Sequence, residues 1–346
     1  MPLQPTTPDA ATWDAFVRRH PRGHLLQLST WGTLKAGYGW QPWRMALADA
    51  SGALVAGGQI LLRRLPLRLG KLAYLPFGPL VDWTDESQVS ATLAALRQAA
   101  RQQGAAFLKL EPGFDVPAEL LVRHGLHPSP QTIQPPSTLI LDLDDEAAIQ
   151  KRMNQMTRRN LRKSEKFEIT VRQGSRADVD QFNTLLDETG DRKAFGVHVA
   201  SYYATAYDLF VPPGDAALFI ASYGALDLAG VFVFRLGQQA WYLYGASRGE
   251  ERQRMAPFAA QWAGIRWALE HGCTTYDLYG IPDADEATLE AEFEQRHAGL
   301  WGVYRHKRGW GGRVARTVGA WDAVYNRPVY WLYHQALRWR GRATSE

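Results

Sequence analysis

The pattern of apolar and polar residues predicts a hairpin, a helix and a strand in the first half of the chain. Apolar runs at residues 59–62 and 71–75 are typical of two buried strands. Apolar residues then recur at helical spacing until Gly104, a residue type that commonly ends helices; they are Val89, Leu93, Leu96 and Ala100. The apolar run at residues 106–110 predicts the strand that follows this helix.

The same order returns in the second half. Apolar runs at residues 231–234 and 241–244 predict a second hairpin, and residues 275–279 predict a later strand. Between them, Pro257 is well placed to begin a helix and Gly272 to end it. The apolar stripe of this helix is Phe258, Trp262, Ile265 and Leu269.

The distances between glycine landmarks indicate a duplication. Gly58, Gly78 and Gly104 precede their counterparts Gly230, Gly245 and Gly272 by 172, 167 and 168 residues, respectively. This near-constant spacing predicts one α/β module used twice. The alternative is a chance match between two common arrangements of hairpin, helix and strand.

Further elements are predicted outside the repeated part. Short helices at residues 13–19 and 178–188 begin the modules, and residues 151–167 form a basic helix. Residues 308–316 are rich in Gly and Arg and predict a loop. The apolar positions of the basic helix are Met153, Met156 and Leu161, and those of a C-terminal amphipathic helix are Val329, Leu332, Tyr333, Ala336 and Leu337.

Composition and charge add a first functional indication. A length of 346 residues favours two domains, and 46 % hydrophobic with 21 % charged residues is typical of a globular protein. The net charge of +4 is unevenly distributed, because residues 151–172 have a balance of +6 and residues 302–346 of +7, which leaves −9 for the other 279. Two basic patches on an acidic body favour a polyanionic partner.

The single cysteine and the N-terminus indicate the compartment. Cys273 alone excludes an intrachain disulfide and favours a reducing environment. Residues 1–12 lack the apolar core of a signal peptide, and no stretch approaches the ~18–20 apolar residues of a spanning helix. We therefore expect a soluble cytoplasmic protein, with the inner face of the membrane as a further location.

The sequence has no strong match to familiar catalytic or metal-binding motifs. Residues 245–249 read Gly-Ala-Ser-Arg-Gly, which fits a hydrolase elbow formally, but charged residues follow where a helix should begin. The alternative is a glycine-bounded loop at a strand end. His20 with His24, and His124 with His127, have metal-like spacing in loop contexts, and we expect no metal site. The chain has no Walker A and no Gly-x-Gly-x-x-Gly pattern.

The order of elements resembles acetyltransferase-like folds. This predicts an α/β (α+β) protein with two tandem GNAT-like domains, whose mixed sheets are flanked by helices. Members that use coenzyme A bind its pyrophosphate at a helix start, through the string [Q/R]-x-x-G-x-[G/A]. The string occurs at residues 101–106 and 338–343, which are a helix exit and the tail. The sequence therefore predicts the fold without its usual cofactor.

Residues 302–316 interleave aromatic and basic side chains. Basic groups contact phosphates and aromatic rings stack on bases, so this stretch predicts binding of single-stranded nucleic acid. A solvated basic surface is the alternative. The aromatic members are Tyr304, His306 and Trp310, and the basic ones are Arg305, Lys307, Arg308 and Arg313.

Five segments resemble the FemABX family of peptidoglycan interpeptide bridge-forming aminoacyltransferases. They are residues 26–35 (LQLSTWGTLK), 134–143 (QPPSTLILDL), 158–166 (RRNLRKSEK), 243–247 (LYGAS) and 304–312 (YRHKRGWGG), in the family's order. The resemblance implies transfer of an amino acid from aminoacyl-tRNA to the side-chain amine in the stem peptide of a cell-wall precursor. It implies two acetyltransferase-like domains, which we expect at residues 1–147 with 318–346 and at residues 148–317.

The resemblance also implies residues that bind the acceptor. Lys35, in the same motif as Trp31, is similar to a family lysine that contacts the precursor's diphosphate; a structural lysine is the alternative. His198, with Tyr202 four residues on, lies in a second phosphate-binding region where the family often has Arg. Because His is a weaker and pH-dependent donor, this departure puts the phosphate contact at position 198 in doubt.

Further residues are expected near the donor. Tyr242 and Tyr244 alternate with apolar neighbours, and we expect one of them in the cleft; core packing is the alternative. Lys307 resembles a lysine near the tRNA acceptor end that stabilises negative charge at the ester, and a solvated lysine is the alternative. The resemblance implies aminoacyl-tRNA as co-substrate and no cofactor. The expected tRNA contacts are Lys307, Arg305, Arg308 and Arg313.

The reaction requires the acceptor amine to lose a proton. Glu111, just past a predicted strand of the first module, and Asp277, in the equivalent predicted strand of the second, are the candidate catalytic carboxylates. Positioning alone, or proton transfer through the tRNA 3′ hydroxyls, are the alternatives.

Two other functions remain open at this point. One is an N-acyltransferase of the same fold that uses acyl-CoA or another activated donor. The other is a non-catalytic RNA- or membrane-binding protein, whose aromatic, Arg-rich tail at residues 330–342 lies on a membrane surface. The sequence leaves open whether the acceptor is UDP-linked or lipid-linked, and which amino acid is transferred.

Overall fold

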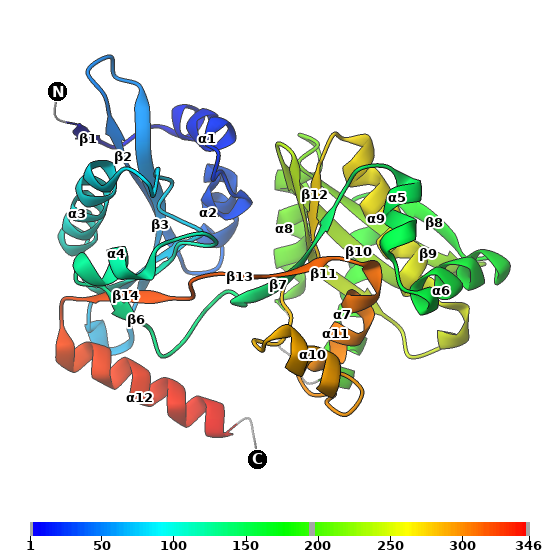
Figure 1. Ribbon diagram of the computed structural model, residues 1–346. Helices are drawn as coiled ribbons and strands as arrows, with labels where there is room; N and C mark the ends of the chain where they lie inside the picture. Colours follow the sequence, from blue (N-terminus) through cyan, green and yellow to red (C-terminus); the bar gives the residue numbers. More distant parts are fainter. Residues whose placement is uncertain (1–2, 194–197, 344–346) are drawn as a thin grey trace. The chain divides into compact units, whose positions relative to one another are not determined.

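The computed structural model describes residues 3–193 and 198–343, and the chain divides into two compact units. Unit 1 comprises Met1–Gln134 and Thr317–Glu346, and unit 2 comprises Pro135–Arg316 (Figure 1). Each unit contains a seven-stranded sheet with its own hydrophobic core.

Unit 1 has the strand order β1-β2-β3-β4-β5-β14-β6. Its strands are β1 (Gln4–Thr6), β2 (Gln41–Ala48), β3 (Leu54–Arg64), β4 (Lys71–Pro76), β5 (Ala105–Glu111), β6 (His127–Pro128) and β14 (Trp321–Val324). Its helices are α1 (Ala10–Arg19), α2 (Ser29–Ala36), α3 (Glu86–Gln102), α4 (Ala118–Arg123) and α12 (Arg327–Ala343).

Unit 2 has the strand order β13-β7-β12-β11-β10-β9-β8. Its strands are β7 (Ser137–Asp142), β8 (Thr170–Gln173), β9 (Ala216–Tyr223), β10 (Leu226–Leu236), β11 (Gln239–Ser247), β12 (Thr275–Asp277) and β13 (Arg313–Arg316). Its helices are α5 (Glu146–Arg152), α6 (Gln155–Lys166), α7 (Asp178–Lys193), α8 (Ala200–Phe210), α9 (Ala256–Glu270), α10 (Glu286–Glu292) and α11 (Trp301–Lys307).

The two sheets have the same pattern of strand pairing. β4 pairs with β5 in parallel, and β11 pairs with β12 in parallel, whereas the other strand pairs are antiparallel. Each parallel pair is connected by one long helix, α3 or α9, as a crossover requires. The predicted fold class of two tandem acetyltransferase-like domains with mixed sheets is confirmed.

The crossover helices end alike. Gly104 after α3 and Gly272 after α9 have φ values of +76° and +74°, the left-handed conformation in which glycine has no Cβ penalty. Gly58 and Gly230, by contrast, are not equivalent positions. A Cβ at Gly58 would meet Leu96 of α3, whereas a Cβ at Gly230 would meet Phe182 of α7, which packs on the face of its sheet opposite α9.

Neighbouring residues of β3 show how unit 1 is layered. The Cα of Gly58 faces α3. The side chain of the buried Gln59 points to the start of α2, where its amide donates a hydrogen bond to the carbonyl oxygen of Leu28 at 2.7 Å. Because side chains alternate along a strand, α3 and α2 cover opposite faces of this sheet (Figure 1).

The division between the units differs from the predicted boundaries. Residues 135–147, expected in the first domain, belong to unit 2 because β7 pairs with β12 and β13. The return of the chain after Arg316 then supplies β14, which pairs with β5 and β6 in unit 1. The predicted loop at residues 308–316 therefore contains a strand, β13.

The predicted basic helix is interrupted. Asn154 separates α5 from α6, because its side chain accepts a hydrogen bond from the main-chain N–H of Thr157 at 2.7 Å and begins a new helix. Met153 and Leu161 are buried as expected, whereas Met156 is 51 % exposed.

The C-terminal helix α12 buries a face that overlaps the predicted one at Val329 and Tyr333 but excludes Leu332. Val329 and His334 are buried, and the rings of Tyr330, Tyr333 and His334 pack around Phe107 of β5. Leu332, expected among the apolar positions, is 46 % exposed. In the described part of the chain, no helix has both the length and the apolar composition needed to span a bilayer.

Candidate functional site

Unit 2 contains a cavity of about 720 Å³ where two parallel strands separate. β11 and β12 pair only over residues 239–241 and 275–277. β11 then continues to Ser247, whereas β12 ends at Asp277. The cavity is lined by residues of β11, the first turn of α9, the segment after β12, and α11. The carboxyl ends of parallel strands are a common ligand-binding position in α/β sheets.

A β-bulge brings both tyrosines of β11 to this cavity. Val233 of β10 pairs with Tyr242 and Phe232 with Tyr244, so Leu243 is the extra residue. The bulge breaks the regular alternation of side chains. Tyr242 packs beside the core that includes α9, and Tyr244 packs against α8, yet both line the cavity. We predicted only one of them there.

Gly245 leaves room for the ring of Tyr242. A Cβ at this position would lie 1.8 Å from Tyr242 Oη and 2.5 Å from Cζ, distances that no side chain can adopt without moving the ring. Burial raises the pKa of Tyr242 to about 12, so its hydroxyl remains protonated at neutral pH. The strand therefore presents a fixed, uncharged phenol.

Lys307 places a cation in the cavity. Its Nζ donates hydrogen bonds to the carbonyl oxygens of Tyr279 at 3.0 Å and Gly280 at 2.7 Å, and the residue is 7 % exposed. The ammonium also lies 5.8 Å from the centre of the Tyr242 ring, within the range of cation–π attraction. These contacts exclude the alternative of a solvated lysine and fix a positive charge where it can stabilise a developing negative one.

Asp277 supports the turn that holds Lys307. Its Oδ1 accepts hydrogen bonds from the hydroxyl of Thr138 and from the main-chain N–H of Tyr279 at 2.6 Å. Tyr279 has a φ of +60°, a conformation that costs energy for a bulky residue unless its surroundings enforce it. Asp277 is not among the residues that line the cavity, so the structure gives it a positioning role in place of the predicted catalytic one.

The environment of Asp277 makes its ionised form less favourable than it is in water. Burial raises the pKa of this carboxyl group to about 6, against the hydrogen bonds from Thr138 and Tyr279 and the positive charges of Lys307 and Arg313.

His198 and Tyr202 occupy different layers. The ring of His198, which lines the cavity, stacks on Tyr202 with 3.9 Å between the ring centres. Tyr202 is 1 % exposed and is not among the lining residues; its hydroxyl lies 3.1 Å from that of Tyr244. Tyr202 therefore supports the binding surface from below. Residues 194–197 of the predicted phosphate-binding region lie outside the described part of the chain.

The start of α9 forms another wall of the cavity. Met255, Ala256 and Pro257 line it, together with Arg248 and Arg252 of the preceding loop. Pro257 has no N–H group, and that of Phe258 donates to the carbonyl oxygen of Met255 at 2.9 Å, so the attraction of this wall for an anion comes from the helix dipole and from Arg252. The coenzyme A strings lie elsewhere, since residues 101–106 span the end of α3 and residues 338–343 the end of α12.

The Gly-Ala-Ser-Arg-Gly motif has no elbow geometry. Ser247 is the last residue of β11, and α9 begins only at Ala256. The main-chain N–H of Ser247 donates to Thr189 Oγ1 at 2.9 Å, and its carbonyl oxygen accepts from the same hydroxyl at 3.0 Å. This is a strand end tied to α7, as the alternative interpretation predicts.

The predicted tRNA contacts separate into different environments. Lys307 lies in the cavity, whereas Arg305 and Arg313 are exposed. Arg308 forms an ion pair with Glu290 through two hydrogen bonds and lies 4.0 Å above the ring of Phe293. Its guanidinium group is therefore largely used within the fold.

Unit 1 contains the predicted acceptor-binding pair on α2. The ammonium of Lys35 lies 4.9 Å from the centre of the Trp31 ring, one helical turn away. Burial lowers the pKa of Lys35 to about 8. Trp31 itself is 5 % exposed, so the ring supports the lysine from within the fold.

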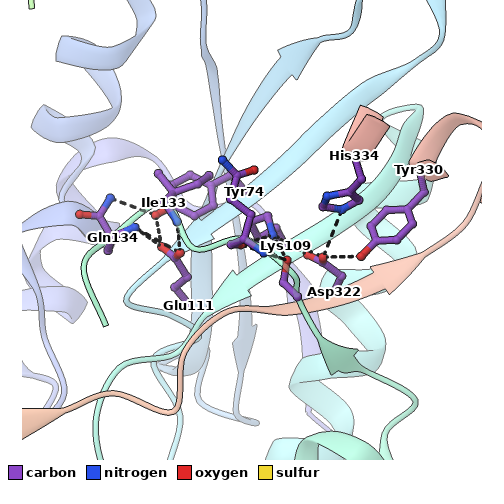
Figure 2. Close-up of polar contacts among 10 residues, drawn as sticks. Tyr74, Lys109, Glu111, Ile133, Gln134, Asp322, Tyr330 and His334 are labelled. Atoms are coloured by element: carbon purple, nitrogen blue, oxygen red, sulfur yellow. Dashed lines mark hydrogen bonds and ion pairs between the residues drawn. The ribbon is translucent and has the colours of Figure 1, made fainter. Parts of the chain in front are cut away.

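Glu111 is engaged in an internal network (Figure 2). Its carboxylate accepts hydrogen bonds from the hydroxyl of Tyr74 and from the main-chain N–H groups of Ile133 and Gln134. Burial raises the pKa of Glu111, and the hydrogen bonds and the charge of Lys109 oppose this. The predicted base instead fastens residues 133–134 to the end of β5. It lines only a small cavity of about 10 Å³.

A second network in unit 1 anchors α12 (Figure 2). Lys109 of β5 and Asp322 of β14 form an ion pair at 3.0 Å, and both side chains are fully buried. The hydroxyl of Tyr330 donates to Asp322 Oδ2 at 2.8 Å. The helix is therefore held to the sheet by polar contacts as well as by aromatic packing.

Several residues of the cavity were not assigned to the cleft from the sequence, although His306 was expected to stack on bases. Tyr279, His306 and Phe258 line it, as does the carboxylate-bearing Glu250. The rings of His306 and Phe258 meet edge to face, with 4.6 Å between their centres. A signal existed for two of them, since His306 stands in the aromatic and basic stretch and Phe258 on the helix stripe. Tyr279 and Glu250 reach the cavity through loop conformations that the sequence does not reveal.

Within the described residues, no three His, Cys, Asp or Glu side chains gather as metal ligands would. His24, one of the histidines with metal-like spacing, instead stacks on Phe77 with 3.8 Å between ring centres.

Comparison with known proteins places this geometry in a class. The solved structure of FemX aligns with a TM-score of 0.84 at 23 % identity, over 95 % of this chain and 99 % of that one. A tandem GNAT protein from the clavulanic acid biosynthesis pathway aligns with a TM-score of 0.55 at 14 % identity, over 93 % and 98 %. The fold is thus a tandem acetyltransferase-like one.

Sequence comparison gives the family. The model of the FemAB family matches residues 9–119, 123–225 and 219–338, and the chain belongs to this family. The Lipid II:glycine glycyltransferase of Staphylococcus saprophyticus is 27 % identical over 397 aligned positions, which cover 92 % of each protein. The predicted family and the predicted enzyme class are confirmed, and the protein is an aminoacyltransferase.

Proposed function

We propose that this enzyme transfers an amino acid from aminoacyl-tRNA to the side-chain amine in the stem peptide of a lipid-linked peptidoglycan precursor. The observation that carries the proposal is the ammonium of Lys307, which is held by two carbonyl groups inside the cavity of unit 2. The name of the staphylococcal relatives, Lipid II:glycine glycyltransferase, supports a lipid-linked acceptor and a transferred aminoacyl group.

The cavity suits the aminoacylated end of a tRNA. Tyr242, Tyr244 and Phe258 offer aromatic surface for the terminal base, and the start of α9 with Arg252 offers an electropositive wall for a phosphate. Arg305 and Arg313, both exposed, contact more distant phosphates of the acceptor stem in this proposal, although Arg313 also lies 4.0 Å from the carboxylate of Asp142. In this proposal tRNA is a co-substrate, and no cofactor takes part.

The reaction is aminolysis of an ester. The neutral acceptor amine attacks the ester carbonyl carbon and forms the C–N bond, and the carbonyl oxygen becomes an oxyanion. The ammonium of Lys307 stabilises this charge. The C–O bond to the tRNA ribose then breaks, and the proton from the amine passes to the leaving ribose oxygen. Because Glu111 and Asp277 are engaged in internal hydrogen bonds, positioning supplies most of the rate in this scheme.

The acceptor's diphosphate binds at Lys35 in this proposal. The side chain is half-buried with its ammonium over the ring of Trp31, so it presents a positive charge with little side-chain freedom. A pKa of about 8 leaves Lys35 mostly charged at neutral pH, and a bound diphosphate raises that fraction further.

The test combines purified protein with a lipid-linked and, separately, a UDP-linked muramyl pentapeptide, and with a pool of charged tRNAs. Mass spectrometry should show an added amino acid on the lipid-linked precursor, and ribonuclease treatment of the donor should abolish it. A product on neither precursor overturns the function. A product that survives ribonuclease overturns the tRNA donor and favours an acyl-CoA or another activated donor, and a product on the UDP-linked precursor alone overturns the lipid-linked acceptor.

A further inference from the structure

The outward face of α12 carries large apolar side chains in the open. Trp331 is 60 % exposed, Leu332 is 46 % exposed and Trp339 is 76 % exposed. These are three of the largest exposed apolar groups of the described chain, and they share one helix. Single exposed apolar residues are ordinary on protein surfaces, but a cluster on one face marks an interaction site.

The spacing of these residues defines a continuous stripe. Trp331, Gln335 and Trp339 follow at intervals of four, so they lie above one another on the helix, and Leu332 lies beside them. The opposite face is the one that packs on Phe107 through Tyr330, Tyr333 and His334. Figure 1 shows α12 along the border of unit 1, with no other element of that unit over its outer side.

The charge of α12 indicates which kind of partner binds its exposed face. α12 contains Arg327, Arg338, Arg340 and Arg342 and no Asp or Glu. Arg327 and Arg338 are exposed and flank the apolar stripe. Tryptophan prefers the boundary between lipid headgroups and acyl chains, and arginine pairs with anionic headgroups. An aliphatic side chain such as Leu332 gains nothing from RNA bases or phosphates.

We propose that the outward face of α12 docks unit 1 on the surface of an anionic lipid bilayer. Trp331, Leu332 and Trp339 enter the headgroup boundary, and Arg327 and Arg338 contact the lipid phosphates. The helix lies on the membrane and does not cross it, because its inner face remains packed on the sheet. The internal contacts of Tyr330 with Asp322 and of Phe107 with Tyr333 keep the helix in this orientation.

This docking is independent of the transfer reaction, because it rests only on α12. It would also keep the enzyme at the surface where a lipid-linked acceptor lies, which is consistent with the proposed function without depending on it.

The test measures cosedimentation of the full chain with vesicles of phosphatidylglycerol and phosphatidylethanolamine, and with vesicles of phosphatidylcholine alone. We expect binding to the anionic vesicles that falls as salt rises. The variant W331A/W339A should bind at least about tenfold more weakly, because the apolar area that enters the lipid is lost. W331F/W339F should recover part of the binding, and circular dichroism should show that both variants are folded.

A matched control tests whether any loss of two positive charges weakens vesicle binding. Arg159 and Arg162 are exposed on α6, and R159Q/R162Q removes the same number of charges as R327Q/R338Q. Only the change on α12 should weaken vesicle binding. No binding to anionic vesicles, unchanged binding of W331A/W339A, or an equal loss in R159Q/R162Q overturns the proposal. Two further outcomes also overturn it. In one, the natural protein sediments as a dimer and W331A/W339A as a monomer. In the other, W331A/W339A loses RNA binding while it still binds vesicles.

Discussion

The ammonium nitrogen of Lys307 donates a hydrogen bond to the carbonyl oxygen of Gly280 at 2.7 Å, across 27 residues of chain. The carbonyl oxygen of Tyr279 accepts a second one at 3.0 Å. Since the turn that carries these acceptors is itself held by Asp277, the position of the positive charge depends on three segments of unit 2. This relationship leads to the first two predictions.

Replacement of Lys307 by Gln should lower kcat by roughly 100-fold or more, since removal of one oxyanion-stabilising donor has an effect of that order. The side chain stays long and polar, so the cavity is largely preserved. Steady-state transfer of a labelled amino acid measures the change. The control is Arg159→Gln on α6, which removes an exposed charge outside the cavity and should leave kcat nearly unchanged. Equal losses in both variants would contradict the assigned role.

Replacement of Asp277 by Asn should change how stability depends on pH. The folded-state pKa is raised from 3.8 to about 6, so the folded protein binds the proton more tightly than the unfolded chain. The contribution of this carboxyl group to the free energy of unfolding is therefore fully present below about pH 4 and is lost as the pH rises to about 6. The amide that replaces the carboxyl group in the variant does not titrate.

The free energy of unfolding of Asp277→Asn minus that of the natural protein should therefore increase between pH 4 and pH 7, by up to about 3 kcal/mol. Urea unfolding at several pH values measures this difference. The contributions of the other titrating groups are the same in both proteins and cancel. A flat difference would show that the carboxyl group is not buried as described. Asp277→Ala, which also removes the acceptor for Tyr279, should in addition lower kcat because Lys307 loses its support.

Replacement of Gly245 by Ala should displace the Tyr242 ring, because the new Cβ would lie 1.8 Å from its Oη. We expect a loss of about 1–3 kcal/mol in stability and a large loss of activity. In a Tyr242→Ala background the same change should cost much less, which thermal unfolding of the four proteins in the cycle can establish. Gly37→Ala, whose Cβ would meet only the carbonyl oxygen of Leu34 at 3.6 Å, is the control and should be close to neutral.

Replacement of Lys35 by Met should stabilise unit 1 and weaken acceptor binding. Burial lowers the folded-state pKa from 10.5 to about 8, so the folded protein binds this proton less tightly than the unfolded chain. The destabilisation caused by burying the charged lysine is fully present below pH 8 and disappears as the pH approaches 10.5.

Chemical unfolding should therefore show Lys35→Met more stable by about 1–3 kcal/mol at pH 7, with a smaller gain at pH 10. The KM for the precursor should rise at the same time. A variant that loses stability at pH 7 would instead indicate the structural lysine considered as the alternative.

Replacement of Lys109 by Met should destabilise the protein by about 3–5 kcal/mol, because it leaves the fully buried Asp322 without its cation. The double variant Lys109→Met with Asp322→Leu should recover most of this loss, as measured by thermal unfolding. The exposed pair of Arg123 and Glu86 provides the contrast, since Arg123→Met should cost less than about 1 kcal/mol. Similar costs for the two pairs would argue against burial as the cause.

Local regularities made much of the fold predictable. The stripe of α3 and the glycine that ends it are visible in the sequence because helical spacing and left-handed φ values restrict the residue types. The duplication followed from the spacing of Gly104 and Gly272. The exchange of strands, in which β7 joins unit 2 and β14 joins unit 1, was missed in part because strand pairing over long separations leaves no periodic signal.

The candidate site was predicted less completely. Lys307, His198 and one of the pair Tyr242 and Tyr244 were expected at the site, and all four residues line one cavity. Glu111 was assigned by its place just past a strand and Asp277 by its place in the equivalent strand, and only the structure shows that hydrogen bonds occupy both carboxyl groups. Tyr279 was missed because it reaches the cavity through its φ of +60°, which residue type does not indicate.

The sequence by itself determined the tandem module, the family and the presence of a basic, aromatic segment after the second module. These depend on local spacing and on residue types, which can be read along the chain. Tertiary structure decided where each of those basic groups lies: Arg308 pairs with Glu290, Arg305 faces solvent, and Lys307 enters the cavity. The physical reason is that the environment of a charge, whether a carboxylate, water or two carbonyl groups, is set by segments that meet only on folding.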